Sequence, residues 1–271
     1  MVLTAWAHAL VNVLVALGML VVVPLGRRLA DGGHHRWWYL GAVPGAICLW
    51  LPRGALATAL AATYLLAAVA LLAGIPARLL PVRRITAAGL ALCTALASPA
   101  VAAAALVAER SGYRLFGFKL DVLALTAAHF HYAGFAAALV AGLVARLDGR
   151  GRAAALAVPA GTGLVLAGFF TGAPVELAGA VVLTGGLWLV ALHTARLAAD
   201  RLTRALFLTS AAVLAATMAL ALDWALGRTT GLAHLTLSWM VATHGAANAL
   251  GFALCSLLAL RRLTAGDTVP A

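Results

Sequence analysis

Long apolar runs alternate with short polar segments along all 271 residues of the chain. A helix of about 20 apolar residues is long enough to cross the hydrocarbon core of a bilayer, and charged residues and prolines mark where most of the runs end. The pattern therefore predicts an all-α, polytopic transmembrane helix bundle of about nine spans. Their expected positions are residues 3–25, 37–51, 54–75, 85–107, 120–145, 153–171, 175–198, 205–226 and 231–260.

The composition agrees with a membrane protein. Hydrophobic residues make up 64% of the chain and charged residues only 10%. A soluble domain needs roughly 25% charged residues to cover its surface, so most of this surface is expected to face lipid. The polar stretches are too short to bury a core of their own. We therefore expect residues 1–271 to form a single membrane-embedded domain.

The basic residues predict the orientation of the chain. They give a net charge of +11 but lie in short clusters between the apolar runs, which argues against nucleic acid as a partner. Fourteen of the 19 Lys and Arg residues, among them Arg78, Arg83 and Arg84, fall in odd-numbered connections or the C-terminal tail. The positive-inside rule places these segments in the cytoplasm. The prediction is a multi-pass protein of the cytoplasmic membrane, with its N-terminus outside, its C-terminus in the cytoplasm and the lipid bilayer as its partner.

Segment 109–119 is basic and aromatic, although it lies on the predicted outer side. It is expected to be an interfacial segment with its rings at headgroup level, a cap over an outward-facing cavity, or an ordinary loop anchored by its aromatic residues.

Polar side chains inside the predicted spans indicate where function resides, because each costs roughly 2.5–3.5 kcal/mol at membrane depth. The fifth span carries Asp121, His129, His131 and Tyr132. His129 and His131 are about 200° apart on a regular helix, so they are expected to address different neighbours. In the ninth span, His244 and Asn248 are four residues apart and share one face.

Most of these polar residues fall in the predicted outer half of the membrane or near its midplane. We expect a polar cavity there, lined by spans one, five, seven, eight and nine. An alternative is that the residues near the outer ends sit in hydrated headgroups, and that the deeper histidines hydrogen-bond between helices. The candidate residues are His8, Asn12, Asp121, His129, His131, Tyr132, Glu176, Asp223, His244 and Asn248.

Two stretches resemble the YndJ-like family of bacterial integral membrane proteins. They are the run from Leu125 to Phe135, which contains His-Phe-His-Tyr, and the run from Thr243 to Phe252. The end of the first span, at Val21 to Leu25, fits the same family. The resemblance implies a transporter-type membrane protein with His129, His131, His244 and Asn248 as its key positions.

The His-Phe-His-Tyr run is also locally similar to a helix of heme-copper oxidase subunit one, in which two histidines bind two different hemes. That resemblance implies, as an alternative, a single heme held between His129 or His131 and His244. No Cys or His spacing typical of a zinc site is present, so a metal and any other cofactor stay unknown.

The leading prediction is a small transporter or binding protein for an unknown small molecule. Its histidines would form a polar or proton-responsive site, because imidazole titrates near physiological pH. One alternative is a membrane-embedded enzyme, either dependent on heme or metal or acting on a lipid-like substrate by acid–base chemistry. Whether the chain is an enzyme stays open, and no residue is assigned a catalytic role. A further alternative is a structural or signalling protein in which the polar residues only join helices.

Overall fold

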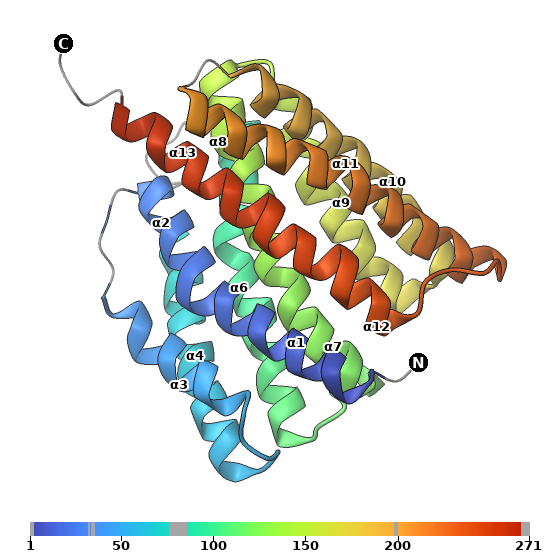
Figure 1. Cartoon of the computed structure of the whole chain (residues 1–271). Helices are drawn as coiled ribbons and strands as arrows, with labels where there is room; N and C mark the ends of the chain where they lie inside the picture. Colours follow the sequence, from blue (N-terminus) through green and yellow to red (C-terminus); the bar gives the residue numbers. More distant parts are fainter. Residues whose placement is uncertain (1–2, 32, 34–35, 76–85, 198–199, 267–271) are drawn as a thin grey trace. The chain divides into compact units, whose positions relative to one another are not determined.

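The computed structural model describes residues 3–31, 33, 36–75, 86–197 and 200–266 (Figure 1). These residues form helices and no strand, which confirms the predicted all-α class. The predicted basic connection with Arg78, Arg83 and Arg84 lies outside them. Eight helical stretches in the described part are long and apolar enough to cross a membrane: Ala5–Asp31, Ala55–Ala73, Ala87–Ser111, Leu120–Leu147, Arg152–Thr171, Ala173–Arg196, Arg201–Thr230 and Leu237–Thr264.

The chain divides into two compact units. The first unit comprises Met1–Ile85 and Cys93–Ala136, and the second comprises Thr86–Leu92 and Ala137–Ala271. The expectation that the chain forms one membrane-embedded domain stays a prediction.

The first unit is built around one helix that runs from Ala5 to Asp31 and changes its winding in the middle. A π-helical turn, in which hydrogen bonds reach back five residues instead of four, separates its two α-helical parts. A second π-helical segment follows α7. The elements of this unit are α1 (Ala5–Leu17), η1 (Gly18–Val22), α2 (Val23–Asp31), α3 (Trp38–Cys48), α4 (Ala55–Ala73), α6 (Ala87–Ser111, from Cys93 on), the 3₁₀ turn η2 (Leu115–Gly117), α7 (Leu120–His129) and η3 (Phe130–Ala137, to Ala136).

Helix α3 is the second predicted span, and it is shorter than the pattern indicated. Its 11 residues measure about 16 Å at 1.5 Å per residue, against a hydrocarbon core of about 30 Å. The carbonyl groups at and just beyond its C-terminal end, which have no helical partner, accept from side chains of other helices. Asn12 donates to the carbonyl of Leu49 at 2.9 Å, and Arg110 donates to the carbonyls of Cys48, Leu49 and Leu51.

Arg110 belongs to a buried charge cluster where the sequence indicated a loop. Helix α6 continues to Ser111, so Glu109 and Arg110 are helical, and they are only 1% and 8% exposed. The carboxylate of Glu109 accepts from Arg53 at 2.8 Å and from Arg110 at 2.7 Å. The loop that segment 109–119 was expected to form therefore begins after Ser111. Its aromatic residues Tyr113 and Phe116 are exposed.

The second unit contains helices α9 and α10 as a closely packed pair (Figure 1). A Cβ atom on Gly179 of α10 would come within 2.4 Å of the backbone nitrogen of Val165 in α9, so only glycine permits this approach. Helix α11 packs against α10 and against the C-terminal helix. The elements of this unit are α8 (Ala138–Asp148), α9 (Arg152–Thr171), α10 (Ala173–Arg196), α11 (Arg201–Thr230), α12 (Leu237–Met240), η4 (Val241–Gly245), η5 (Asn248–Leu254) and α13 (Cys255–Gly266).

Asp200 caps the first turn of α11 just outside the membrane-spanning segment. Its carboxylate accepts from the hydroxyl and the amide of Thr203 and from the amide of Leu202. These hydrogen bonds, together with the nearby Arg262 guanidinium, lower the pKa of the Asp200 carboxyl to about 2.

The buried charge cluster generates a stability prediction. Replacing Glu109 with Gln keeps the shape but leaves Arg53 and Arg110 without their shared counter-charge. We expect the free energy of unfolding to fall by about 3 kcal/mol, as for other buried ion pairs that lose one partner. Thermal unfolding of the full-length protein in detergent measures the change.

The matched control is Arg262→Gln, which removes an ion pair with Asp200 that is about half exposed on both sides. It should cost less than about 1 kcal/mol. Equal unfolding temperatures for the two variants would contradict a stabilising role for the buried cluster.

Candidate functional site

His131 lies in the π-helical segment η3 of the first unit and is fully buried. Its Nδ1 is 2.6 Å from the carbonyl oxygen of Ala127, which only accepts, so Nδ1 carries the proton. In the neutral ring, Nε2 is then an acceptor, and the hydroxyl of Tyr64 donates to it at 2.7 Å. Both ring nitrogens of His131 are thus occupied by protein groups.

The surroundings of His131 are tightly packed. The Tyr64 ring stacks on the imidazole with centroids 5.9 Å apart, and the indole of Trp38 meets Tyr64 edge-on at 5.5 Å. A Cβ atom on Gly18 would lie 2.6 Å from the imidazole ring. Tyr132, the next residue along η3, donates its hydroxyl to the carbonyl of Leu14 at 2.7 Å. His131 and Tyr132 therefore join η3 to α4 and to the first helix.

The change of helix type between His129 and His131 alters one premise of the sequence analysis. The helix is regular only as far as His129, and the π-helical segment begins at Phe130. The angle of 200° applies to a regular helix only, so it does not describe these two residues, and the expectation that they address different neighbours stays a prediction. The half-buried His129 ring meets Phe130 edge-on with centroids 6.1 Å apart.

Pro24 explains how α3 is held against the first helix, a role that the sequence analysis missed. Proline has no N–H, so the carbonyls of Leu20 and Met19, four and five residues earlier, receive no helical hydrogen bond from it. The indole of Trp38 donates to Met19 at 2.8 Å, and the hydroxyl of Tyr39 lies 3.5 Å from Leu20. A proline followed by an aromatic pair after a basic connection was the available signal.

The predicted site residues near the N-terminus form a separate group. The Nε2 atom of His8 is 3.2 Å from the carboxylate of Asp121, which also accepts from the amide of Leu3 at 3.0 Å. Asn12, by contrast, is engaged with the carbonyl of Leu49 at the end of α3. The structure thus pairs His8 with Asp121 and gives Asn12 a capping contact instead.

In the second unit, His244 and Asn248 meet Thr217 of α11. The Nδ1 atom of His244 is 2.8 Å from the carbonyl oxygen of Thr217, so this nitrogen carries the proton. Asn248 is 8% exposed; it donates to the carbonyl of His244 and accepts from the Thr217 hydroxyl, both at 2.9 Å. We name Thr217, His244 and Asn248 the His244 cluster.

The second ring nitrogen distinguishes His244 from His131. Because Nδ1 of His244 is the donor, Nε2 of the neutral ring carries the lone pair. Among the residues that the structure describes, no hydrogen-bond partner for this Nε2 is present, and the side chain is only partly buried. The lone pair is therefore available to an external donor, proton or cation. Like His131, His244 lies in a π-helical segment, an irregularity that is frequent at functional sites.

The predicted acidic residues of the second unit have unlike surroundings. Glu176 is 9% exposed, and its Oε2 is 3.5 Å from a guanidinium nitrogen of Arg228. Asp223 is exposed on α11. Of these two residues, Glu176 is thus the one held in an ion pair among the residues that the structure describes.

The predicted site residues therefore fall into several local groups. His8, Asn12, Asp121, His129, His131 and Tyr132 belong to the first unit, and Glu176, Asp223, His244 and Asn248 belong to the second. The cavity expected to combine them stays a prediction, as does a heme between histidines of the two units. Within the described residues, no group of three or more His, Cys, Asp or Glu side chains is placed to hold a metal ion.

The helices and the buried polar contacts define a polytopic α-helical membrane protein. The particular family follows from a match to the YndJ-like protein family over residues 13–252. The chain belongs to this family, and the matched range includes both histidine segments. No curated protein and no solved structure matches the chain.

The contact between Gly18 and His131 generates a packing prediction. A methyl group at Gly18 would overlap the His131 ring, which is held by hydrogen bonds on both nitrogens. We expect Gly18→Ala to lower the free energy of unfolding by about 1–3 kcal/mol, the usual cost of overpacking. The unfolding temperature in detergent measures the effect.

Gly163→Ala is the matched control, because Gly163 is an exposed helical glycine with no heavy atom within 4 Å of a built Cβ. This variant should be neutral or more stable by up to about 1 kcal/mol. If Gly18→Ala has the same unfolding temperature as the control, the packing of Gly18 against the His131 ring does not contribute to stability.

Proposed function

We propose that this YndJ-like protein is a small transporter or binding protein that holds a small polar molecule or cation at His244. The single observation that carries the proposal is the Nε2 atom of His244. Its ring is oriented by the Thr217 carbonyl, while the lone pair on Nε2 stays available in the described part of the chain.

The energetics of the membrane support a ligand at this position. Polar groups at membrane depth are costly and are normally paired inside the protein. In the His244 cluster, the Thr217 hydroxyl donates to Asn248, Asn248 donates to the backbone carbonyl of His244, and the Thr217 carbonyl orients the imidazole. A ligand that donates a hydrogen bond, or a proton or cation, completes the pairing at Nε2. His131 does not offer this, since its nitrogens bind Ala127 and Tyr64.

The accessibility of Nε2 is tested by chemical labelling. Diethyl pyrocarbonate modifies imidazole nitrogens whose lone pair is accessible. We expect His244 to be labelled in the detergent-purified protein at neutral pH, and the fully buried His131 to stay unlabelled until the protein unfolds. Peptide mass spectrometry reads both sites in one sample. An unlabelled His244 in the native protein would rule out the proposed binding site.

Two substitutions separate ligand binding from helix joining. In His244→Asn, the side-chain amide replaces Nδ1 and keeps the hydrogen bond to Thr217, but the Nε2 position is lost. In His244→Gln, the amide nitrogen takes the Nε2 position, and the oriented imidazole is lost. Because His244→Asn keeps the hydrogen bond to Thr217, we expect its free energy of unfolding to differ from that of the wild type by less than about 1 kcal/mol, the usual contribution of one hydrogen bond. We expect the variant to lose function nevertheless, because it has no group at the Nε2 position.

Function is measured in proteoliposomes exposed to a soluble metabolite extract and analysed by mass spectrometry. Wild-type vesicles should retain or accumulate at least one polar solute or cation that His244→Asn and His244→Gln vesicles do not. Identical profiles for all three proteins would reject the proposal. They would leave the His244 cluster as a contact that only joins helices.

A further inference from the structure

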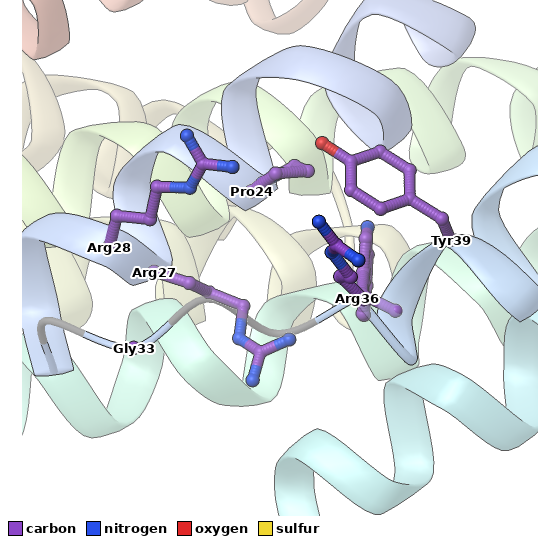
Figure 2. A pocket seen from close by; sticks show the side chains of 7 residues that line it. Pro24, Arg27, Arg28, Gly33, Arg36 and Tyr39 are labelled. Carbon is purple, nitrogen blue, oxygen red and sulfur yellow. The ribbon is translucent and has the colours of Figure 1, made fainter.

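Three arginines line one cavity of the first unit, near the end of α2 and the beginning of α3. Arg27, Arg28 and Arg36 line a cavity of 130 Å³ together with Trp38 and Tyr39 (Figure 2). Within the described part of the chain, no acidic residue lines it. A cavity needs about 10–15 Å³ to admit one water molecule, so this one has room for a tetrahedral phosphate group. We name it the arginine pocket.

Arg27 places a positive charge deep in the wall of the arginine pocket. Its side chain is 2% exposed, and the guanidinium carbon lies 4.7 Å from the ring centroid of Trp37 and 5.7 Å from that of Trp38. These distances are those of cation–π contacts. Arginine stays protonated on burial, so the positive charge is retained and its position is set by the two rings.

The aromatic side of the arginine pocket is also held in place. Trp38 is 1% exposed, and its indole N–H donates a hydrogen bond to the Met19 carbonyl. The hydroxyl of Tyr39 donates to the Leu20 carbonyl. Pro24, which lacks the N–H that would donate to one of these carbonyls, itself lines the pocket. The pocket is therefore pre-organised by the same contacts that attach α3 to the first helix, which lowers the entropy cost of binding a ligand.

An ordinary cytoplasmic connection also collects arginines, under the positive-inside rule. That rule requires only charge on one side of the membrane and is satisfied by side chains that extend into water. Here one guanidinium is buried and stacked, and two exposed arginines, Arg28 and Arg36, line the same partly open cavity. This arrangement is typical of a binding site for a compact anion, because guanidinium groups form forked hydrogen bonds with phosphate oxygens.

We propose that the arginine pocket binds a phosphate group, either the headgroup phosphate of an anionic phospholipid or a free phosphate ion. Arg28 and Arg36 donate hydrogen bonds to the phosphate oxygens, and Arg27 supplies positive charge from the wall. On the predicted orientation, this pocket lies at the cytoplasmic boundary, where basic pockets between membrane helices bind lipid headgroups. The site lies in the first unit, so it is independent of the function proposed for His244 in the second unit.

The test compares two double variants of the full-length protein. Arg28→Gln/Arg36→Gln removes the two exposed arginines of the pocket and leaves the buried Arg27 in place, so folding should be retained. Arg201→Gln/Arg204→Gln is the control, because it removes two exposed arginines from another connection that is predicted to be cytoplasmic. Circular dichroism and unfolding temperature establish that both variants are folded.

Two probes distinguish the sources of the phosphate. Dioleoyl phosphatidylglycerol is titrated into the protein in neutral detergent and counted by native mass spectrometry, with dioleoyl phosphatidylcholine as the neutral reference. Inorganic phosphate is titrated separately and followed by thermal shift at constant ionic strength, with chloride as the reference anion. Binding of the lipid probe identifies a headgroup site, and binding of phosphate alone identifies a site for the free ion.

For at least one probe, the pocket variant should bind about tenfold more weakly than the wild type, while the control variant changes less than about twofold. Equal losses in the two variants would show non-specific attraction between charges and overturn the proposal. Equal binding of both probes by the wild type and the pocket variant would overturn it as well.

Discussion

The first unit depends on one constraint, which is that a polar group inside a bilayer must find its partner within the protein. Pro24 removes one N–H donor from the first helix, and Trp38 and Tyr39 at the start of α3 donate to two carbonyls in the turn before it. The opposite end of α3 meets the same requirement through Arg110, which donates to its last carbonyls. A helix too short to cross the membrane alone is thus attached at both ends by groups that need partners.

The same constraint gives the two histidine segments different chemistry. His131 has both nitrogens occupied and packs against Gly18 and Tyr64, so it stabilises the junction of three helices. His244 has one nitrogen fixed by Thr217 and the other available in the described part of the chain. The contacts of His131 are those of a structural residue, and the second nitrogen of His244 is the basis of the binding role proposed for it. The difference lies in the neighbours of the ring and not in the residue itself.

Several features were predictable from local sequence. Apolar runs indicated the eight long helices, and the cost of polar groups at membrane depth indicated the histidine segments as the places to examine. Glu109 and Arg110 were assigned to a loop, because two adjacent charges usually mark a polar connection. They are helical and buried, because Arg53, 56 positions earlier in the chain, supplies the second positive charge that makes burial of the carboxylate tolerable.

Hydropathy by itself determined the class of this protein, because the free energy of burying a helix in lipid is a sum over neighbouring residues. The winding of the helices and the partners of the histidines were decided only by the tertiary structure. His131 meets Tyr64 at a separation of 67 positions, and His244 meets Thr217 at a separation of 27. A hydrogen bond requires two groups to lie about 3 Å apart. Hydropathy, which is summed over neighbours in the sequence, carries no information on the distance between residues far apart in the chain.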